Sequence, residues 1–149
     1  MTFGGEGLRD VTGGDRAEEL VLLSDLGRLC AKYLDENIRG IKAERVQCDE
    51  VWSFCYAKEK NVPDELRGQF GYGSVWTWAA LDKDSKLLIT YLVGLRDADS
   101  AQVFIDDLAG RLHGKPQITT DGLKLYVAPI AESFGEFVDY GMLVKIYGD

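Results

Sequence analysis

The sequence predicts an α/β fold in which helices flank a mixed β-sheet. Two apolar segments rich in β-branched and aromatic residues are separated by the short polar stretch 82–85 (DKDS), which predicts an antiparallel hairpin. Helical and strand patterns then alternate toward the end of the chain, which predicts βαβ crossovers. The length of 149 residues and the hydrophobic share of 46% suffice for one domain with a sizeable core.

The N-terminal region is expected to contain one long helix. Residues 1–14 are rich in glycine and show no periodic pattern, so we expect this segment to be disordered. In residues 15–45 Asp15 is a candidate N-cap, and Glu18 lies three residues later, as in a capping box. Apolar residues then recur at helical spacing: Leu22, Leu26, Leu29, Cys30 and Tyr33.

Three strands are expected next. Residues 46–57 (VQCDEVWSFCYA) have the aromatic and β-branched composition of a buried strand. Residues 58–73 form a long polar connection containing proline and glycine. Residues 74–81 and 86–94 are the two strands of the predicted hairpin.

The remaining elements alternate between helix and strand. An amphipathic helix is expected after Asp97 or Asp99, either of which can act as its N-cap. A short strand over 116–120, a helix over 123–134 and a last strand over 137–146 complete the predicted fold.

Composition narrows the class of protein. No apolar run approaches the roughly 20 residues of a membrane span, and the N-terminus lacks the pattern of a secretory signal, so a cytoplasmic protein with no membrane partner is expected. Cys30, Cys48 and Cys55 lack Cys-x-x-Cys spacing and are expected to be reduced, buried thiols. His113 is the only histidine, which excludes most zinc sites.

The net charge is −8, and no half of the chain forms the basic module that phosphate binding requires. We interpret the acidity as a solvated surface that favours solubility.

Two carboxylates are candidates for chemistry. Asp49 lies in the first predicted strand, and Asp121 lies where a later strand meets Gly122. If these two strands are neighbours, the two side chains could face each other across the sheet. At about 4 Å and an effective dielectric constant near 20, two like charges repel by roughly 4 kcal/mol. A divalent cation such as Mg²⁺ would offset that repulsion. The pattern alone leaves open the alternative to a metal site, which is that both aspartates are solvated acids at strand ends.

Glu50 is adjacent to Asp49, but strand periodicity places it on the other side, with Trp52. It is therefore not assigned to the metal.

Several short motifs, taken together in order and spacing, resemble a known family. They run DEVWSF at 49–54, WTW at 76–78, ALD at 80–82, RD at 96–97 and TTDG at 119–122, followed by Tyr126. This arrangement resembles bacterial insertion-sequence transposases of the DDE class, specifically the insertion-sequence-one type. The resemblance runs from about Ala17 to Asp149.

The resemblance implies an RNase H-like catalytic core that cuts DNA at the ends of the element and joins those ends to a target. Asp49 matches the first catalytic, metal-binding acid and Asp121 matches the second. The implied cofactor is Mg²⁺ or Mn²⁺. The implied partners are DNA, both the insertion-sequence ends and the target, and further copies of the protein in a homo-oligomer when full length.

The sequence also departs from the family pattern. The third catalytic acid and its surrounding stretch are absent, so residues 46–149 are expected to be a partial core, incomplete at the C-terminus. Residues 15–45 are expected to be a helical remnant of an N-terminal DNA-binding region, which makes the chain truncated at both ends. Pro129 falls inside a predicted helix, where it removes a backbone donor, unless it starts a second short helix. Two alternatives stay open: a noncatalytic remnant of a transposase, and a small acidic binding module.

Other side chains have competing interpretations. Trp76 and Trp78 share a strand face and are expected to pack in the core rather than stack on bases. Tyr126 could orient DNA or pack a helix. Lys58, Lys60 and Arg67 could contact phosphates but are expected to be solvated.

Overall fold

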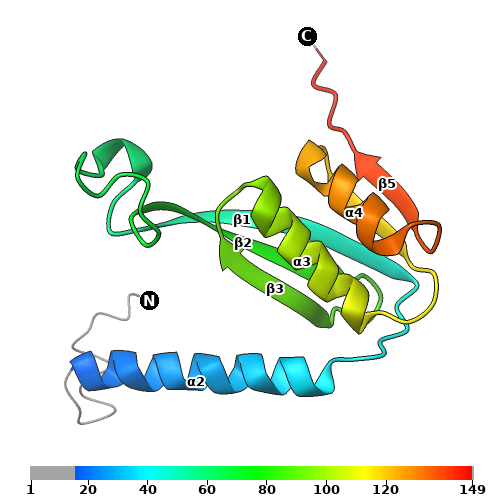
Figure 1. Cartoon of the computed structure of the whole chain (residues 1–149), viewed down its shortest axis with the longest axis horizontal. Helices are drawn as coiled ribbons and strands as arrows, with labels where there is room; N and C mark the ends of the chain where they lie inside the picture. The colour runs from blue at the N-terminus through cyan, green and yellow to red at the C-terminus, as the bar shows by residue number, and fades with distance from the viewer. Residues whose placement is uncertain (1–15, 149) are drawn as a thin grey trace. The chain divides into compact units, whose positions relative to one another are not determined.

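The structure is a computed structural model that describes residues 16–148. The chain divides into two compact units, one ending at Ile38 and the other beginning at Arg39, and each is described by itself (Figure 1). The expectations for residues 1–14 and for the Asp15 cap lie outside the described residues.

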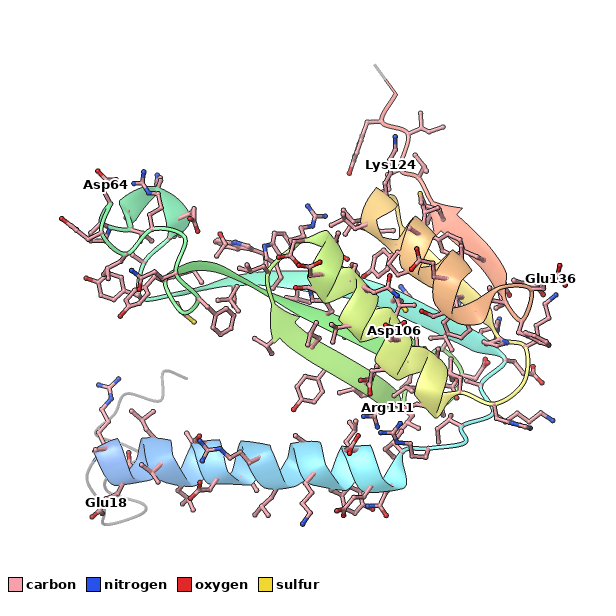
Figure 2. All side chains as sticks on the ribbon, viewed as in Figure 1. Glu18, Asp64, Asp106, Arg111, Lys124 and Glu136 are labelled. Atoms are coloured by element: carbon pink, nitrogen blue, oxygen red, sulfur yellow. The ribbon has the colours of Figure 1, made fainter. Side chains whose placement is uncertain are left out.

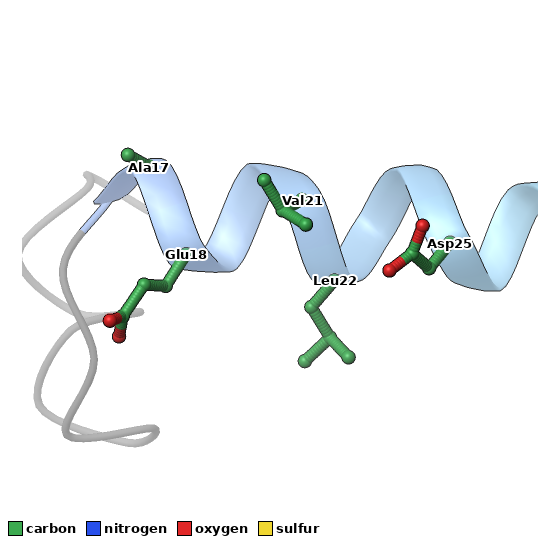
Figure 3. A pocket seen from close by; sticks show the side chains of 5 residues that line it. All are labelled: Ala17, Glu18, Val21, Leu22 and Asp25. Atoms are coloured by element: carbon green, nitrogen blue, oxygen red, sulfur yellow. The ribbon is translucent and has the colours of Figure 1, made fainter.

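The first unit contains helix α2, Arg16–Asn37, which confirms the predicted N-terminal helix. Ion pairs join Asp25 to Arg28 at 3.0 Å and Lys32 to Glu36 at 3.8 Å on its exposed surface, where such pairs contribute little. A hollow of about 440 Å³ lies beside the first half of the helix (Figure 3). Its lining residues are Ala17, Glu18, Val21, Leu22 and Asp25.

The second unit is built on one five-stranded sheet with the strand order β3-β2-β1-β4-β5. The strands are β1 Arg45–Cys55, β2 Gly73–Asp82, β3 Leu88–Gly94, β4 Gln117–Asp121 and β5 Asp139–Leu143. Strand β2 is antiparallel to β1 and β3, whereas β4 is parallel to β1 and to β5. The predicted fold class, an RNase H-like mixed sheet with an antiparallel hairpin and βαβ crossovers, is confirmed.

Helices α3 (Ala98–Arg111) and α4 (Val127–Phe134) form the two crossovers and lie side by side on the sheet (Figure 1). Among the described residues, no helix is long and apolar enough to cross a membrane. The largest fully buried side chains of the core come from the sheet and both crossovers: Trp78, Tyr126, Phe104, Ile89, Ile105, Leu108, Ile118 and Ile130. Burial of such side chains stabilises the fold by about 1.5–3 kcal/mol each.

Helix α3 begins after the first of the two candidate caps that the sequence offered. Asp97 is the N-cap, and its Oδ1 accepts a hydrogen bond of 2.8 Å from the backbone N–H of Ser100. This bond holds the pKa of the Asp97 carboxyl below its ordinary value. In the middle of the helix, Asp106 accepts a hydrogen bond from Ser133 of α4, which joins the two crossover helices (Figure 2).

The segment after Asp121 is not the single helix that the sequence predicted over 123–134. A 3-10 turn, Lys124–Tyr126, comes first, and α4 starts at Val127. Pro129 is therefore in the first turn of α4, where backbone N–H groups have no partner within the helix. The proline costs little at this position.

Strands β1 and β2 continue well beyond the part of the sheet that α3 covers, and we call residues 52–76 the β1–β2 arm (Figures 1 and 2). A short 3-10 helix, Glu59–Asn61, lies in its connecting segment. The Glu59 carboxylate accepts a hydrogen bond of 2.7 Å from the backbone N–H of Ser74. This bond ties the connecting segment to the start of β2.

Candidate metal centre

The parallel pairing of β1 and β4 brings the two predicted acids together. Gln47 pairs with Thr119, and Asp49 and Asp121 each lie two residues further along their strands. Because side chains alternate with period two, the two aspartates lie on the same side of adjacent strands. The expected neighbourhood of these strands is thus observed.

Three carboxylates meet at this point. One oxygen each from Asp49, Glu50 and Asp121 lie within 4.8 Å of one another. Asp49 is exposed, Asp121 is half-buried, and Glu50 is half-buried as a whole residue although its side chain is buried. The sequence-based interpretation set Glu50 aside because of its side of the strand. Its long side chain nevertheless brings its carboxylate into the group.

Backbone hydrogen bonds orient the two aspartates. The N–H of Glu50 donates to Oδ1 of Asp49 at 2.9 Å, and the N–H of Leu123 donates to Oδ1 of Asp121 at 3.0 Å. Within the described part of the chain, neither aspartate forms an ion pair. One oxygen of each aspartate is therefore held by the backbone, and the second oxygen is available to a ligand.

Glu50 has different partners. Arg96 donates to its Oε1 from Nε at 3.1 Å and from Nη2 at 2.9 Å. The Tyr126 hydroxyl donates to its Oε2 at 2.8 Å. The Glu50 side chain is only 1% exposed. Its hydrogen bonds to Arg96 and Tyr126 therefore compensate for the hydration that the carboxylate loses on burial.

Tyr126 joins the acid group to the core. Its ring packs edge-on against Trp78 with centroids 5.4 Å apart, and the residue is fully buried. Burial, together with the hydrogen bond to Glu50, raises the pKa of Tyr126 far above its ordinary value. The phenol is therefore a neutral donor, and of the two interpretations of Tyr126 the structure supports packing.

Arg96 is the residue at this site to which sequence reasoning gave no role, although it lies in one of the recognised motifs. Its guanidinium lies over the Trp76 ring, 4.6 Å from the centroid. Trp78, by contrast, is in the core as expected, and its indole N–H donates to the Leu95 carbonyl at 3.0 Å. Its place two residues after β3, in the recognised RD motif at 96–97, was the available signal.

Oxygen-only ligands and their spacing suit a hard divalent cation. Three carboxylates carry −3, and Arg96 offsets only the charge on Glu50, so close to −2 remains on the two aspartates. Carboxylates at this separation repel by about 3–4 kcal/mol at an effective dielectric constant near 20. Mg²⁺ or Mn²⁺ prefers such ligands and typically takes one or two protein carboxylates. The residues present fit a divalent metal ion.

The cysteines offer no soft ligand at this centre. All three are free thiols, as predicted. Cys48 is buried, and burial raises its pKa, so it stays protonated. The expectation of burial was wrong for Cys30 and Cys55, which are exposed. Cys30 lies on α2, and Cys55 ends β1 in the arm, beyond the cover of α3.

A hollow of about 390 Å³ lies nearby, where β1 and β4 begin. It is lined by Arg45, Val46, Gln47, Lys83, Gln117, Thr119 and Leu143, and the three acids do not line it. The guanidinium of Arg45 is already paired with Asp84.

Comparisons with known proteins give distant structural similarity alone. The sequence matches no protein-family model and no curated protein sequence. Among solved structures, the chain is similar to one in a cryo-EM structure of the piggyBac transposase synaptic complex with hairpin DNA, with a TM-score of 0.44 and 14% identity. The match covers 73% of this chain and 24% of that chain, so this chain spans about a quarter of the length of that one. A similarity of this extent carries no conclusion about activity.

Together the topology and the acid group define a class: an RNase H-like domain with a candidate divalent-metal centre at the ends of two parallel strands.

Proposed function

We propose that this chain is the metal-binding core of a DNA transposase of the bacterial insertion-sequence type. Asp49 and Asp121 are its catalytic and metal-binding residues, and Mg²⁺ or Mn²⁺ is its cofactor. The observation that carries the proposal is the β1–β4 pairing, which gathers the carboxylates within 4.8 Å. The order and spacing of the DEVWSF, WTW and TTDG motifs support the same family.

The chemistry assigned to the centre is cleavage of a phosphodiester bond in DNA. When bound, divalent metal ions activate the attacking oxygen and stabilise the leaving oxygen. Asp49 and Asp121 would hold the metal through the oxygens that the backbone does not occupy. Their negative charge would attract the metal ion. It would repel a DNA phosphate, so the aspartates would not bind the phosphate directly.

Glu50 is proposed to act as a positioning residue. Both of its oxygens accept hydrogen bonds, from Arg96 and from Tyr126. Those bonds restrain β1 beside the helix-covered face of the sheet and keep the Glu50 charge balanced. Asp49, on the same strand, is held in place as a consequence.

A noncatalytic remnant is the second candidate, and one observation favours it. Among the described residues, the acid group contains two aspartates and a glutamate already paired to an arginine. We therefore expect metal binding by this 149-residue chain but little or no strand transfer.

A nicking assay tests the proposal. Supercoiled plasmid DNA is incubated with the purified chain in Mn²⁺, in Mg²⁺ and in EDTA. The proposal predicts slow, metal-dependent nicking that is lost in Asp49→Asn and in Asp121→Asn. Asp139→Asn, which changes an exposed aspartate paired with Lys115, should nick as the parent does.

Nicking that persists in Asp49→Asn and Asp121→Asn would refute the assignment of these residues. Metal binding without any nicking would favour the noncatalytic remnant. Absence of both would favour the small acidic binding module.

A further inference from the structure

Beyond the acid group, the β1–β2 arm exposes large aromatic side chains. Trp52 is 44% exposed and Phe54 is 46% exposed. Their ring centroids are 5.9 Å apart with a tilt of 39°. We call these two rings the aromatic platform.

The platform lies on the Glu50 side of β1, the side opposite to Asp49. Trp52 and Phe54 follow Glu50 at steps of two on β1, so they lie on its side of the strand, about 7 and 13 Å away at a rise of roughly 3.3 Å per residue. Trp52 pairs with Trp76 of β2, and Arg96 bridges the Trp76 ring and the Glu50 carboxylate.

One hydrogen bond orients the Trp52 ring of the platform. The Trp52 indole N–H donates to the Ser74 hydroxyl at 3.1 Å. Ser74 in turn donates its backbone N–H to Glu59, as described above. A ring that is already oriented loses little conformational freedom when another planar group stacks on it.

The charge around the platform differs from that of the whole chain. Residues 56–72 hold three basic and three acidic residues, whereas the whole chain carries −8. Within the described part of the structure, Arg67 is paired with Asp64, while Lys58 and Lys60 are exposed and form no ion pair. Both lysines are solvated, as the sequence predicts, and no carboxylate in the described part of the structure is paired with them, so they are available to phosphates when DNA is bound.

We propose that the aromatic platform stacks on unpaired DNA bases and so holds a single-stranded segment beside the metal centre. Exposed aromatic faces with neighbouring lysines are the features by which proteins bind single-stranded nucleic acid, and every base offers a face for stacking. The choice of DNA as the ligand rests on the proposed function. Paired bases are already stacked on each other, so a duplex should bind less tightly than a single strand.

The test measures binding in EDTA, where metal-dependent cleavage cannot contribute. A fluorescently labelled oligothymidylate of about 12 nucleotides and a duplex of equal length are titrated with the full chain at low salt, and anisotropy is recorded. The parent should bind the single strand more tightly than the duplex. The double variant Trp52→Ala, Phe54→Ala should bind the single strand at least about tenfold more weakly, and Trp52→Phe should retain most of the affinity.

Phe137→Ala is the matched control, because Phe137 is 73% exposed and lies outside the arm. It should bind the single strand as the parent does. Thermal unfolding of each variant shows that the fold is retained.

Equal single-strand affinity of the parent and the double variant would overturn the inference. Equal affinity for the single strand and the duplex would also overturn it. A third contradicting result is a dimer of the chain, detected by sedimentation, that the double variant loses, because the platform would then serve only to join two copies. The outcome is separable from that of the nicking assay. If the double variant binds more weakly but the parent does not nick DNA, the platform is supported and the nuclease activity is rejected. If the parent nicks DNA but the double variant binds as tightly as the parent, the platform alone is rejected.

Discussion

The guanidinium of Arg96 lies between the carboxylate of Glu50 and the ring of Trp76. It donates to Glu50 Oε1 at 2.9 and 3.1 Å and lies 4.6 Å from the Trp76 centroid. Arg96 follows β3, Glu50 belongs to β1 and Trp76 to β2. One side chain thus connects three strands at the edge of the acid group.

Replacing Arg96 by methionine should destabilise the protein when no metal is present. The change leaves the buried Glu50 carboxylate without its cation beside two aspartates, and we expect a loss of about 1–3 kcal/mol in the free energy of unfolding. Added Mg²⁺ should recover part of that loss, because the metal supplies the missing positive charge. Urea unfolding with and without Mg²⁺ measures both effects.

Arg67→Met is the control for this variant, since Arg67 pairs with Asp64 in the exposed arm. It should change the stability by less than about 1 kcal/mol, with no dependence on Mg²⁺. If the Arg96→Met protein without metal is as stable as the parent, the Arg96–Glu50 contact does not contribute to the free energy of unfolding.

Neutralising Glu50 should affect metal binding less than neutralising either aspartate. Glu50→Gln keeps the side-chain length but removes one charge near the metal, so we expect the affinity for Mg²⁺ to fall by less than about tenfold, or 1.4 kcal/mol. Isothermal titration calorimetry gives the comparison. A loss as complete as that in Asp121→Asn would instead make Glu50 a direct ligand.

Gly73 is required where the arm rejoins the sheet. Its φ angle is +91°, and an added Cβ would lie 2.2 Å from Glu59 Oε2. Gly73→Ala should therefore cost about 1–3 kcal/mol in stability through backbone strain and displacement of Glu59. Gly141→Ala, where a Cβ would meet nothing within 4 Å, should be close to neutral by thermal unfolding. Equal melting temperatures for the two variants would contradict this role of Gly73.

The Asp107 carboxyl should make the free energy of unfolding depend on pH under acidic conditions. Burial tends to raise its pKa, but hydrogen bonds from Arg111 and Thr90 outweigh that tendency and hold the pKa below the ordinary value of 3.8. A carboxyl with a lower pKa in the folded state stabilises that state above its unfolded pKa. The stabilisation is lost as the pH falls through the folded value.

The free energy of unfolding of the parent should therefore decline below about pH 4, and Asp107→Asn should show a shallower decline. At neutral pH this variant should be less stable than the parent by about 1–3 kcal/mol, because the buried Arg111 loses the charge of one of its partners. Urea unfolding across pH 2.5–7 tests the prediction. Parallel curves for the two proteins would contradict it.

Local rules predicted much of the fold. Two apolar segments and the turn at 82–85 located the hairpin of β2 and β3, and Asp97 was one of two candidate caps, with Asp99, before an apolar helical stripe. The end of β5 at Leu143 and the turn before α4 were not predicted. Those limits depend on which neighbouring strand or helix is available to pair, and a single sequence does not contain that information.

The candidate site was predicted in part. Asp49 and Asp121 could be paired from sequence because parallel strands bring their carboxyl ends together. The approach of Glu50 to the aspartates could not be predicted, because it depends on how far a long side chain reaches around a strand. The partnership of Glu50 with Arg96 and Tyr126 joins residues 46 and 76 positions apart in the sequence, which no local pattern reveals.

The central claim is that Asp49 and Asp121 jointly hold a divalent metal ion. Calorimetric titration of the purified 149-residue chain with Mg²⁺ tests it most directly, with Asp139→Asn as the control for an exposed aspartate. Saturable binding by the parent and the control, weakened at least about tenfold in both Asp49→Asn and Asp121→Asn, is the predicted result. Absence of binding by the parent, or equal binding by all four proteins, would contradict the claim.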